Sequence, residues 1–245
     1  MSYLNRVIDF ILPPRCLVTG DVVDEQGMVS AAVWGKLNFI STPYCECCGF
    51  PFDYDQDGIQ SGNSCAVCLK YPPVYDKARA ALVYDDASRD IILGYKHGDQ
   101  TYALPTFLPW LERAGADLFN DVNYIMPVPL HPFRLLRRRF NQSGLIAQYL
   151  GKGLRIEYLV DGLKRIRATP TQGYLERQER KKNVKNAFRL NNKYNEQIKG
   201  KNILLIDDVL TTGATINECT KELRRHGVNK VYVLTLARVV KTTRL

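Results

Sequence analysis

Two adjacent carboxylates, Asp207 and Asp208, directly follow four apolar residues at positions 203–206. A short continuous apolar run is typical of a strand that is buried on both faces of a parallel sheet. Ligands of open parallel sheets bind beyond the carboxyl ends of the strands, which is where this pattern places the two carboxylates. Side by side, the carboxylates could accept hydrogen bonds from a vicinal diol or bind a divalent metal ion. We expect both to have partners, because an unpaired buried charge is costly.

A loop of hydroxyl residues and glycine follows the carboxylates and leads into a helix predicted from residue 215. The loop comprises Thr211, Thr212, Gly213, Ala214 and Thr215. Backbone N–H groups at a helix N-terminus, together with such hydroxyls, form a cradle for anions such as phosphate. A diol-binding pair beside a phosphate cradle matches the two ends of a ribose 5-phosphate. The alternative is a loop with a purely structural role.

Four cysteines form the pattern C-x2-C-x16-C-x2-C, which falls within the spacing of structural zinc sites. They are Cys45, Cys48, Cys65 and Cys68, and Gly49 suits the tight turn after the first pair. Disulfides are one alternative, which the absence of a secretion signal disfavours, and a redox C-x-x-C is another. We predict a closed zinc site with four thiolates, which serves folding and partner presentation because it has no open coordination position.

The other three cysteines do not fit this pattern. Cys16 resembles half of a lost pair, because Thr19 stands where a second cysteine would complete C-x2-C. Cys47 breaks the spacing, and Cys219 lies on a predicted helix, where it is most simply a buried apolar residue.

Strands and helices are predicted to alternate from about residue 76. We expect strands at 78–84, 123–130, 202–207 and 230–239, and helices at 87–97, 106–119, 141–154 and 215–227. This order implies an α/β fold, a mostly parallel sheet flanked by helices. Residues 1–75 have dense turn signals and weak periodicity, so we predict a separate N-terminal helix and zinc ribbon there, followed by the sheet domain at 76–245. No internal repeat is apparent.

The positive charge of the chain is concentrated in one stretch. Residues 131–201 contain 18 Lys and Arg against 5 Asp and Glu, a net charge of +13 in a chain whose total is +9. Such a stretch forms either a solvated surface or a binding site for phosphates or a nucleic acid backbone. No apolar run approaches the roughly 20 residues of a membrane helix.

The first residues, MSYLNRVIDFILPPRC, combine a short apolar run with Arg6 and Asp9, and no small-residue cleavage site follows. We expect a short amphipathic helix that ends at Pro13 and Pro14, rather than a signal peptide. These features predict a cytoplasmic protein.

The segment ILLIDDVLTTGAT, residues 203–215, resembles the 5-phosphoribosyl 1-pyrophosphate (PRPP) motif of type I phosphoribosyltransferases. Further segments occur in a fixed order along the chain: the cysteine pairs, YKHGD, PVPLHPFR with FNQ, RIRATPTQ with NVKNAF, and then this motif. That order is similar to the ComF family (competence protein F / GntX-like) over nearly the whole chain. The resemblance implies a type I phosphoribosyltransferase-like sheet domain that carries an N-terminal zinc ribbon.

The resemblance also implies roles for individual residues. Asp207 and Asp208 would be the catalytic pair that holds the ribose 2- and 3-hydroxyls, residues 211–215 would hold the 5-phosphate, and Mg²⁺ would accompany PRPP. Arg134 and Arg138 are candidates for pyrophosphate binding, since guanidinium forks suit phosphate oxygens, although a solvated basic turn is an alternative. The candidates from the family's mobile segment are Arg165 and Arg167.

Two positions depart from the patterns of related proteins. The ComF family usually has R-G-F-N-Q, but Arg139 stands in place of the glycine, which alters or strains the loop if φ must be positive there. Thr211 stands where salvage enzymes for 6-oxopurines carry an acidic residue, which argues against hypoxanthine or guanine as the base.

The ComF family is associated with natural transformation, the import of single-stranded DNA. The resemblance therefore implies a PRPP-binding protein that handles imported DNA, with single-stranded DNA and the DNA-uptake machinery at the inner membrane as candidate partners. Such a partner could hold the protein peripherally at that membrane. The alternatives are an active phosphoribosyltransferase with an unidentified acceptor and a PRPP-sensing regulator. No general base or nucleobase pocket is identifiable, so enzymatic activity does not follow from the sequence.

Overall fold

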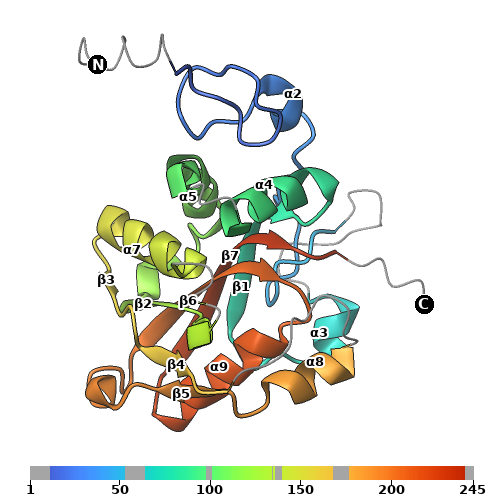
Figure 1. The fold of residues 1–245 in the computed structure, drawn as a ribbon. Helices are drawn as coiled ribbons and strands as arrows, with labels where there is room; N and C mark the ends of the chain where they lie inside the picture. The colour runs from blue at the N-terminus through green and yellow to red at the C-terminus, as the bar shows by residue number, and fades with distance from the viewer. Residues whose placement is uncertain are drawn as a thin grey trace.

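A five-stranded parallel sheet forms the centre of the protein in the order β1-β7-β6-β2-β3 (Figure 1). The computed structural model describes residues 12–52, 64–97, 101–133, 135, 140–167 and 177–240. The strands of the sheet are β1 (Lys77–Val83), β2 (Tyr124–Pro127), β3 (Glu157–Tyr158), β6 (Asn202–Leu210) and β7 (Lys230–Arg238). The predicted α/β class with a parallel sheet is therefore confirmed.

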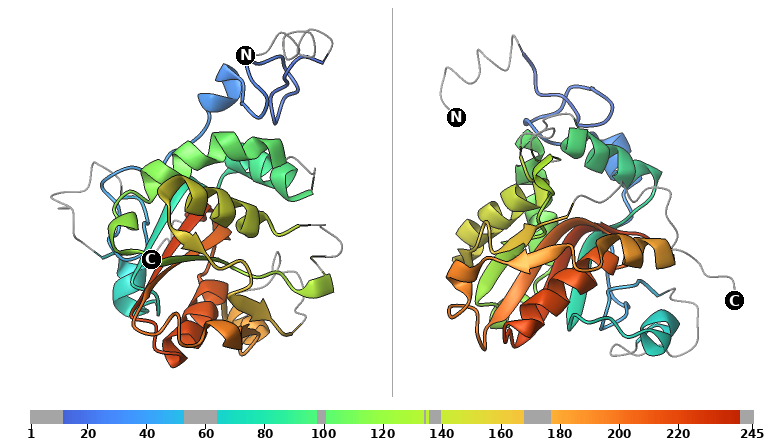
Figure 2. Two further views of the ribbon diagram at one scale, coloured as in Figure 1. Left: turned by 90° about the vertical axis from the view of Figure 1, so that its left-hand side faces the viewer. Right: turned by 60° about the horizontal axis from the view of Figure 1, so that its bottom comes forward.

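Three helices cover one face of the sheet: α4 (Asp86–His97), α5 (Leu104–Ala114) and α7 (Gln142–Leu154) (Figure 2). The other face carries α9 (Ala214–Arg225), α8 (Arg177–Val184) and the antiparallel pair β4 (Leu163–Arg165) and β5 (Phe188–Leu190). Side chains of β6 alternate between the two cores, because successive residues of a strand point to opposite faces. Leu204 lies in the first core and Leu205 in the second.

The N-terminal segment meets both faces of the sheet domain. Its first half contains the short helix α2 (Ala31–Trp34), and Trp34 contacts Trp110 of α5 at 5.8 Å between ring centroids. Its second half contains α3 (Ala66–Lys70) and packs into the core on the α9 side. Figure 1 shows α2 and α3 on opposite sides of the sheet. The predicted division after residue 75 stays a prediction.

A buried arginine joins the second half of this segment to the sheet. Arg79 of β1 is 2% exposed, and its guanidinium lies 2.7 Å from a carboxylate oxygen of Asp117 and 3.1 Å from one of Glu46. It also donates to the backbone carbonyl of Glu46 at 2.9 Å and covers the ring of Tyr44 at 4.6 Å. A buried charge needs such partners, so a different packing of the N-terminal segment on the sheet would leave the Arg79 charge unpaired.

Several predicted elements have different ends in the structure. The strand expected at 202–207 continues to Leu210, because β6 stays paired with β7 as far as Leu210 and Arg238. The helix expected at 106–119 ends at Ala114. A side chain at the next residue, Gly115, would come within 2.6 Å of the Phe119 ring. The strand expected at 123–130 ends at Pro127. Every helix among the described residues is too short or too polar to cross a bilayer.

Candidate functional site

The carboxyl end of β6 extends beyond its neighbour β2. Pairing between these strands ends where Pro127 faces Ile206, and the N–H of Val128 makes a last bond to the Ile206 carbonyl at 2.9 Å. On its other side β6 continues along β7 to Leu210. Asp207 and Asp208 therefore lie on a supported strand whose edge is open where β2 has turned away, which is the usual ligand position in open parallel sheets.

The two carboxylates have different environments. The Asp208 carboxylate lies 2.9 Å from Nζ of Lys96 in α4, and these side chains are 21% and 16% exposed. The Asp207 carboxylate accepts from Oγ of Ser143 at 3.3 Å and from the N–H of Asp208 at 2.9 Å. Burial and the neighbouring Asp208 charge raise the pKa of Asp207 to about 7. Asp207 is thus an acceptor that an incoming hydroxyl or cation would help to ionise.

The first turn of α7 organises the wall opposite β6. Asn141 donates to the carbonyl of Val128 at 3.1 Å, which fixes the chain as it leaves β2. Gln142 donates to the carbonyl of Lys96 at 3.1 Å, which holds the end of α4. Ser143 donates to Asp207 itself. The sequence indicates the FNQ segment only through a family resemblance and does not indicate Ser143, since a contact between residues 143 and 207 has no local signal.

The loop after β6 forms the expected helix N-terminus. Gly213 has φ +73° and precedes the first residue of α9, so the left-handed conformation favours glycine there. Oγ1 of Thr212 is buried and has no hydrogen-bond partner among the described residues. Thr212 is not among the residues that line the cavity described below. The first N–H groups of a helix have no partner within the helix, which suits an anion at this end of α9.

A cavity of about 390 Å³ lies between these parts. It brings together most of the residues that were predicted from the β6 motif: Asp207, Asp208, Thr211, Gly213, Ala214 and Thr215. Residues from three further segments share the wall, namely Lys96, Asn141, Gln142, Ser143 and Arg165. Carboxylates on one side and a helix N-terminus on the other suit a polar ligand that carries hydroxyls and an anionic group.

The predicted arginines have different positions. Arg165 in β4 is buried, lines the cavity and lies over the Phe188 ring at 5.4 Å. Arg167 donates to the carbonyls of Asn183 at 3.0 Å and Lys185 at 2.7 Å and is not among the residues that line the cavity. Arg134 and Arg138 lie outside the described residues. Pyrophosphate binding by these arginines stays a prediction.

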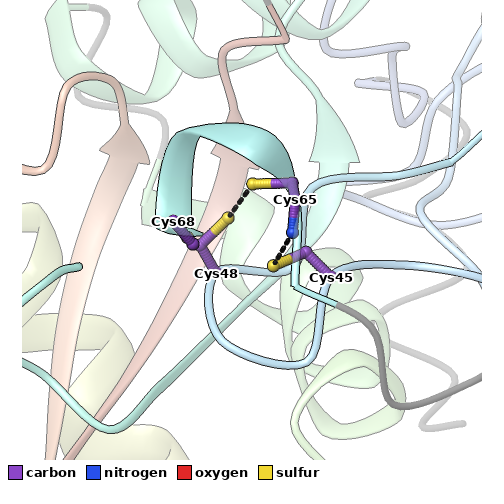
Figure 3. A group of neighbouring side chains, drawn as sticks. All are labelled: Cys45, Cys48, Cys65 and Cys68. Atoms are coloured by element: carbon purple, nitrogen blue, oxygen red, sulfur yellow. Dashed lines mark hydrogen bonds between the residues drawn. The ribbon is translucent and has the colours of Figure 1, made fainter. Parts of the chain in front are cut away.

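The four predicted zinc ligands come together in one buried cluster (Figure 3). All four sulfur atoms lie within 4.8 Å of one another, and the Cys48 and Cys65 sulfurs are 3.7 Å apart. Thiolates at about 2.3 Å from a tetrahedral zinc ion would be about 3.8 Å apart. Gly49 has φ +67°, and the Cys65 N–H donates to the Cys45 sulfur at 3.2 Å. The cluster fits a structural zinc site.

The structure shows an internal repeat, of which the sequence indicates only the first pair of positions, Cys16 and Thr19. Residues 15–22 form the same turn as residues 44–51, closed by one β-bridge in each case. Gly20 takes the positive φ of Gly49, at +75°. Equivalent backbone bonds are Cys16 N–Asp21 O (2.7 Å) with Cys45 N–Phe50 O (2.8 Å), and Gly20 N–Cys16 O (3.1 Å) with Gly49 N–Cys45 O (2.8 Å).

The second half of the repeat has the same correspondence. Ser30 precedes α2 and its N–H donates to the Cys16 sulfur at 3.1 Å, as Cys65 before α3 does to Cys45. The four ligand positions of the zinc cluster thus correspond to Cys16, Thr19, Ser30 and Val33. Three of these four lack a thiol, so this first ribbon has no set of four thiolate ligands, and Val33 is buried among apolar residues instead.

Restoring the missing thiols should restore a metal site. We expect the variant Thr19→Cys/Ser30→Cys/Val33→Cys to bind about one more zinc ion per chain than the unchanged protein, because the backbone already holds the ligand positions of a ribbon. Metal content of the purified protein measures this. A control with alanine at the same three positions should gain no zinc, and a folded cysteine variant without extra zinc would contradict the correspondence.

Comparison with known families agrees with both parts of the structure. The family model of the phosphoribosyl transferase domain matches residues 112–244, and that of the double zinc ribbon domain matches residues 7–70. The fold and the two sites therefore define a phosphoribosyltransferase-type domain with an N-terminal double zinc ribbon, of which the second ribbon keeps the four cysteines.

The relatives narrow this class to one family. Competence protein F of Haemophilus influenzae is 36% identical over 203 residues, which cover 81% of this chain and 86% of that protein. DNA utilization protein YhgH of Escherichia coli is 32% identical over 201 residues, covering 80% of this chain and 84% of that one. Competence protein ComFC of Streptococcus pneumoniae is 31% identical over 166 residues, covering 65% and 67%. The chain belongs to the competence protein F (ComF) family.

Proposed function

We propose that the 390 Å³ cavity binds PRPP or a related ribose 5-phosphate ligand. One observation supports this most directly. Two carboxylates at the end of β6 and the N-terminus of α9, with Gly213 as its N-cap, lie on one strand–loop–helix unit. The carboxylates supply acceptors for a diol at the other end of the same cavity.

In this proposal each part of the site has one task. Asp207 and Asp208 accept hydrogen bonds from the 2- and 3-hydroxyls, and the loop of residues 211–215 binds the 5-phosphate through N–H groups and hydroxyls. Mg²⁺ bound with PRPP would offset part of the charge of its pyrophosphate. Arg165 lines the same cavity from β4, which supports contact with an anionic group. We assign Arg134, Arg138 and Arg167 to the pyrophosphate side.

The relatives support a cellular role in DNA uptake. Two of them are named competence proteins and a third a DNA utilization protein. We propose that this chain handles single-stranded DNA during natural transformation, on the cytoplasmic side and together with uptake machinery at the inner membrane. The stretch at 131–201, with its net charge of +13, provides the electrostatic attraction that single-strand binding requires.

A second candidate function is phosphoribosyl transfer to an acceptor. A cavity of about 670 Å³ with mostly apolar side chains opens beside the first and shares four lining residues with it: Pro129, Leu130, Asn141 and Arg165. Such a space would accept a flat apolar group next to a ribose phosphate. A PRPP-sensing regulator would use the first cavity alone.

Three measurements on the full chain separate these functions. We expect calorimetry with PRPP and Mg²⁺ to show one site per chain, and no binding would refute the proposed ligand. Pyrophosphate release with a panel of bases tests transfer, and silence across the panel leaves binding or sensing. A fluorescent single strand should bind at low salt and be released as salt rises. No binding at low salt would remove the DNA role.

A further inference from the structure

We infer that the zinc ribbon positions the phosphate loop, and that Asn217 is the residue through which it does so. The two sites are formed by segments far apart in the chain, yet they share one hydrophobic core. This core includes all four cysteines of the zinc cluster as well as Leu210, Ala214 and Ile216 around the loop. The inference rests on the proposed ribose-phosphate site, and it adds a coupling between that site and the metal.

The first connection runs from α3 to the start of α9. After the ligand Cys68, the chain leads within a few residues to Val74, whose N–H donates to Oδ1 of Asn217 at 2.8 Å. Asn217 in turn donates its own N–H to the carbonyl of Gly213 at 2.8 Å, which closes the first turn of α9. One residue therefore joins the segment that leaves the zinc cluster, through its side chain, to the turn that would hold the phosphate, through its backbone N–H.

An aromatic ring also lies next to this turn. Tyr75 is 6% exposed, and a methyl group placed on Gly213 would lie 3.9 Å from its ring. The Tyr75 ring is thus adjacent to the residue whose positive φ opens the loop. Movement of residues 74–75 would change both the support of Gly213 and the hydrogen bond to Asn217.

A second connection reaches another part of the cavity wall. The Arg238 side chain donates to the carbonyl of Cys48 and lies over the Phe50 ring at 5.5 Å. Its backbone carbonyl accepts from Tyr84 at 2.7 Å, and the next residue, Val239, bonds to the carbonyl of Leu210 at 2.9 Å. Tyr84 and Val239 both line the cavity. The ribbon is therefore connected to the first turn of α9 through Val74 and to this wall through Arg238.

A zinc ion with four thiolate ligands has no open coordination position and does not react with the phosphate ligand. It can therefore affect ligand binding only by fixing the positions of the residues around it. We expect bound zinc to hold α3 and residues 71–76 in one arrangement. The loop of residues 211–215 then loses less conformational entropy when its ligand binds. By linkage, a ligand that prefers the ordered loop must raise the apparent affinity for zinc by the same factor. Asn217 is a positioning residue in this scheme, since it acts through Gly213 and Val74.

The test compares Asn217→Ala with the unchanged full-length protein, both loaded with zinc. Alanine favours the helix, so α9 should stay folded. We expect one zinc per chain in both proteins and faster amide hydrogen exchange at residue 74 and at 213–217 in the variant. The affinity for PRPP with Mg²⁺ should fall about fivefold to tenfold, within the usual range of coupling between sites.

Competition with a chelator measures the zinc affinity with and without PRPP. A residue that only stabilises the fold would not change the difference between these two affinities. PRPP should raise the zinc affinity of the unchanged protein, and Asn217→Ala should reduce this effect. Adding Arg238→Met should remove it, because methionine keeps the packing on Phe50 without the donor. The control Asn191→Ala also loses a 2.8 Å side-chain hydrogen bond, to Asp161, away from both sites, and should behave as the unchanged protein.

Two results overturn the inference, and they differ from failure of the proposed function. If PRPP binds equally well to the unchanged protein and to Asn217→Ala, with equal protection of zinc, then the sites are not coupled. If amide exchange at 213–217 is the same in both proteins, the positioning role is wrong whether or not PRPP binds. Absence of PRPP binding by the unchanged protein refutes the proposed ligand, and the exchange experiment still decides the coupling.

Discussion

The variant Asp207→Asn/Asp208→Asn should lose measurable binding of PRPP while its fold remains intact. Each carboxylate offers a charged acceptor to a hydroxyl, and such bonds contribute about 1.5–3 kcal/mol apiece. Loss of both corresponds to a decrease in affinity of roughly 10²- to 10⁴-fold. Calorimetry with PRPP and Mg²⁺ measures this. Unchanged affinity would refute the assignment of the site.

The single variants should differ in stability because the carboxylates have different partners. Asp207→Asn removes a carboxylate whose pKa is raised to about 7 by burial and by Asp208. The raised pKa means that ionisation of Asp207 destabilises the ligand-free protein progressively from about pH 4 to pH 7. The variant should therefore be more stable than the unchanged protein at pH 8, with little difference at pH 4. Asp208→Asn should be less stable, because it leaves the largely buried Lys96 without its ion pair.

The same pKa predicts how ligand affinity depends on pH. The ionised form of Asp207 is the better acceptor, so affinity of the unchanged protein should rise between pH 6 and pH 8. Asp207→Asn should lack this component and show only the titration of the ligand phosphates. Asp161→Asn is a matched control, since Asp161 bonds to Asn191 and Tyr194 at a distance from the cavity. A pH dependence identical in all three proteins would contradict the role of Asp207.

The parts of the site that are contiguous in sequence could be predicted, and the parts that depend on tertiary contacts could not. The carboxylates, the hydroxyl loop and α9 occupy one strand–loop–helix unit, where each residue type constrains the next. The zinc ligands form pairs at a fixed spacing. Lys96 and Ser143, by contrast, reach the carboxylates from helices whose positions depend on the packing of the whole sheet. Periodicity gives the existence of those helices but not their contacts.

The hidden repeat shows a different limit. Its ligand positions are identifiable in sequence only through cysteine, and three of the four have been replaced. The spacing also differs, with 10 residues between Thr19 and Ser30 against 16 between Cys48 and Cys65. What remains is a pattern of backbone hydrogen bonds and two glycines with positive φ, and the hydrogen bonds leave no signal in composition or periodicity. The predicted end of the strand at residue 207 was wrong for a related reason, since pairing with β7 extends β6 beyond the two aspartates to Leu210.

Replacement of one zinc ligand should destabilise the chain more than a substitution of Asp207, Asp208 or Asn217. In Cys65→Ser the hydroxyl is a poor ligand, so zinc content should fall well below one per chain. The loss of a structural zinc should cost at least about 3 kcal/mol of stability, given the binding free energies of such sites. The cysteines are at most 8% exposed and share a core with the phosphate loop, so the effect should extend beyond the ribbon.

The position of Cys65 makes this substitution a specific test of the metal. Cys65 precedes α3 with φ −68° and ψ 156°, the conformation of a helix N-cap. Serine is among the preferred residues at that position, so the variant should keep or improve the start of α3. Any loss of stability then reports the missing thiolate. Cys47→Ser changes a neighbouring cysteine outside the ligand set and should retain zinc and its unfolding temperature. If Cys65→Ser folds with unchanged zinc content and an unchanged unfolding temperature, the four-cysteine cluster is not the metal site.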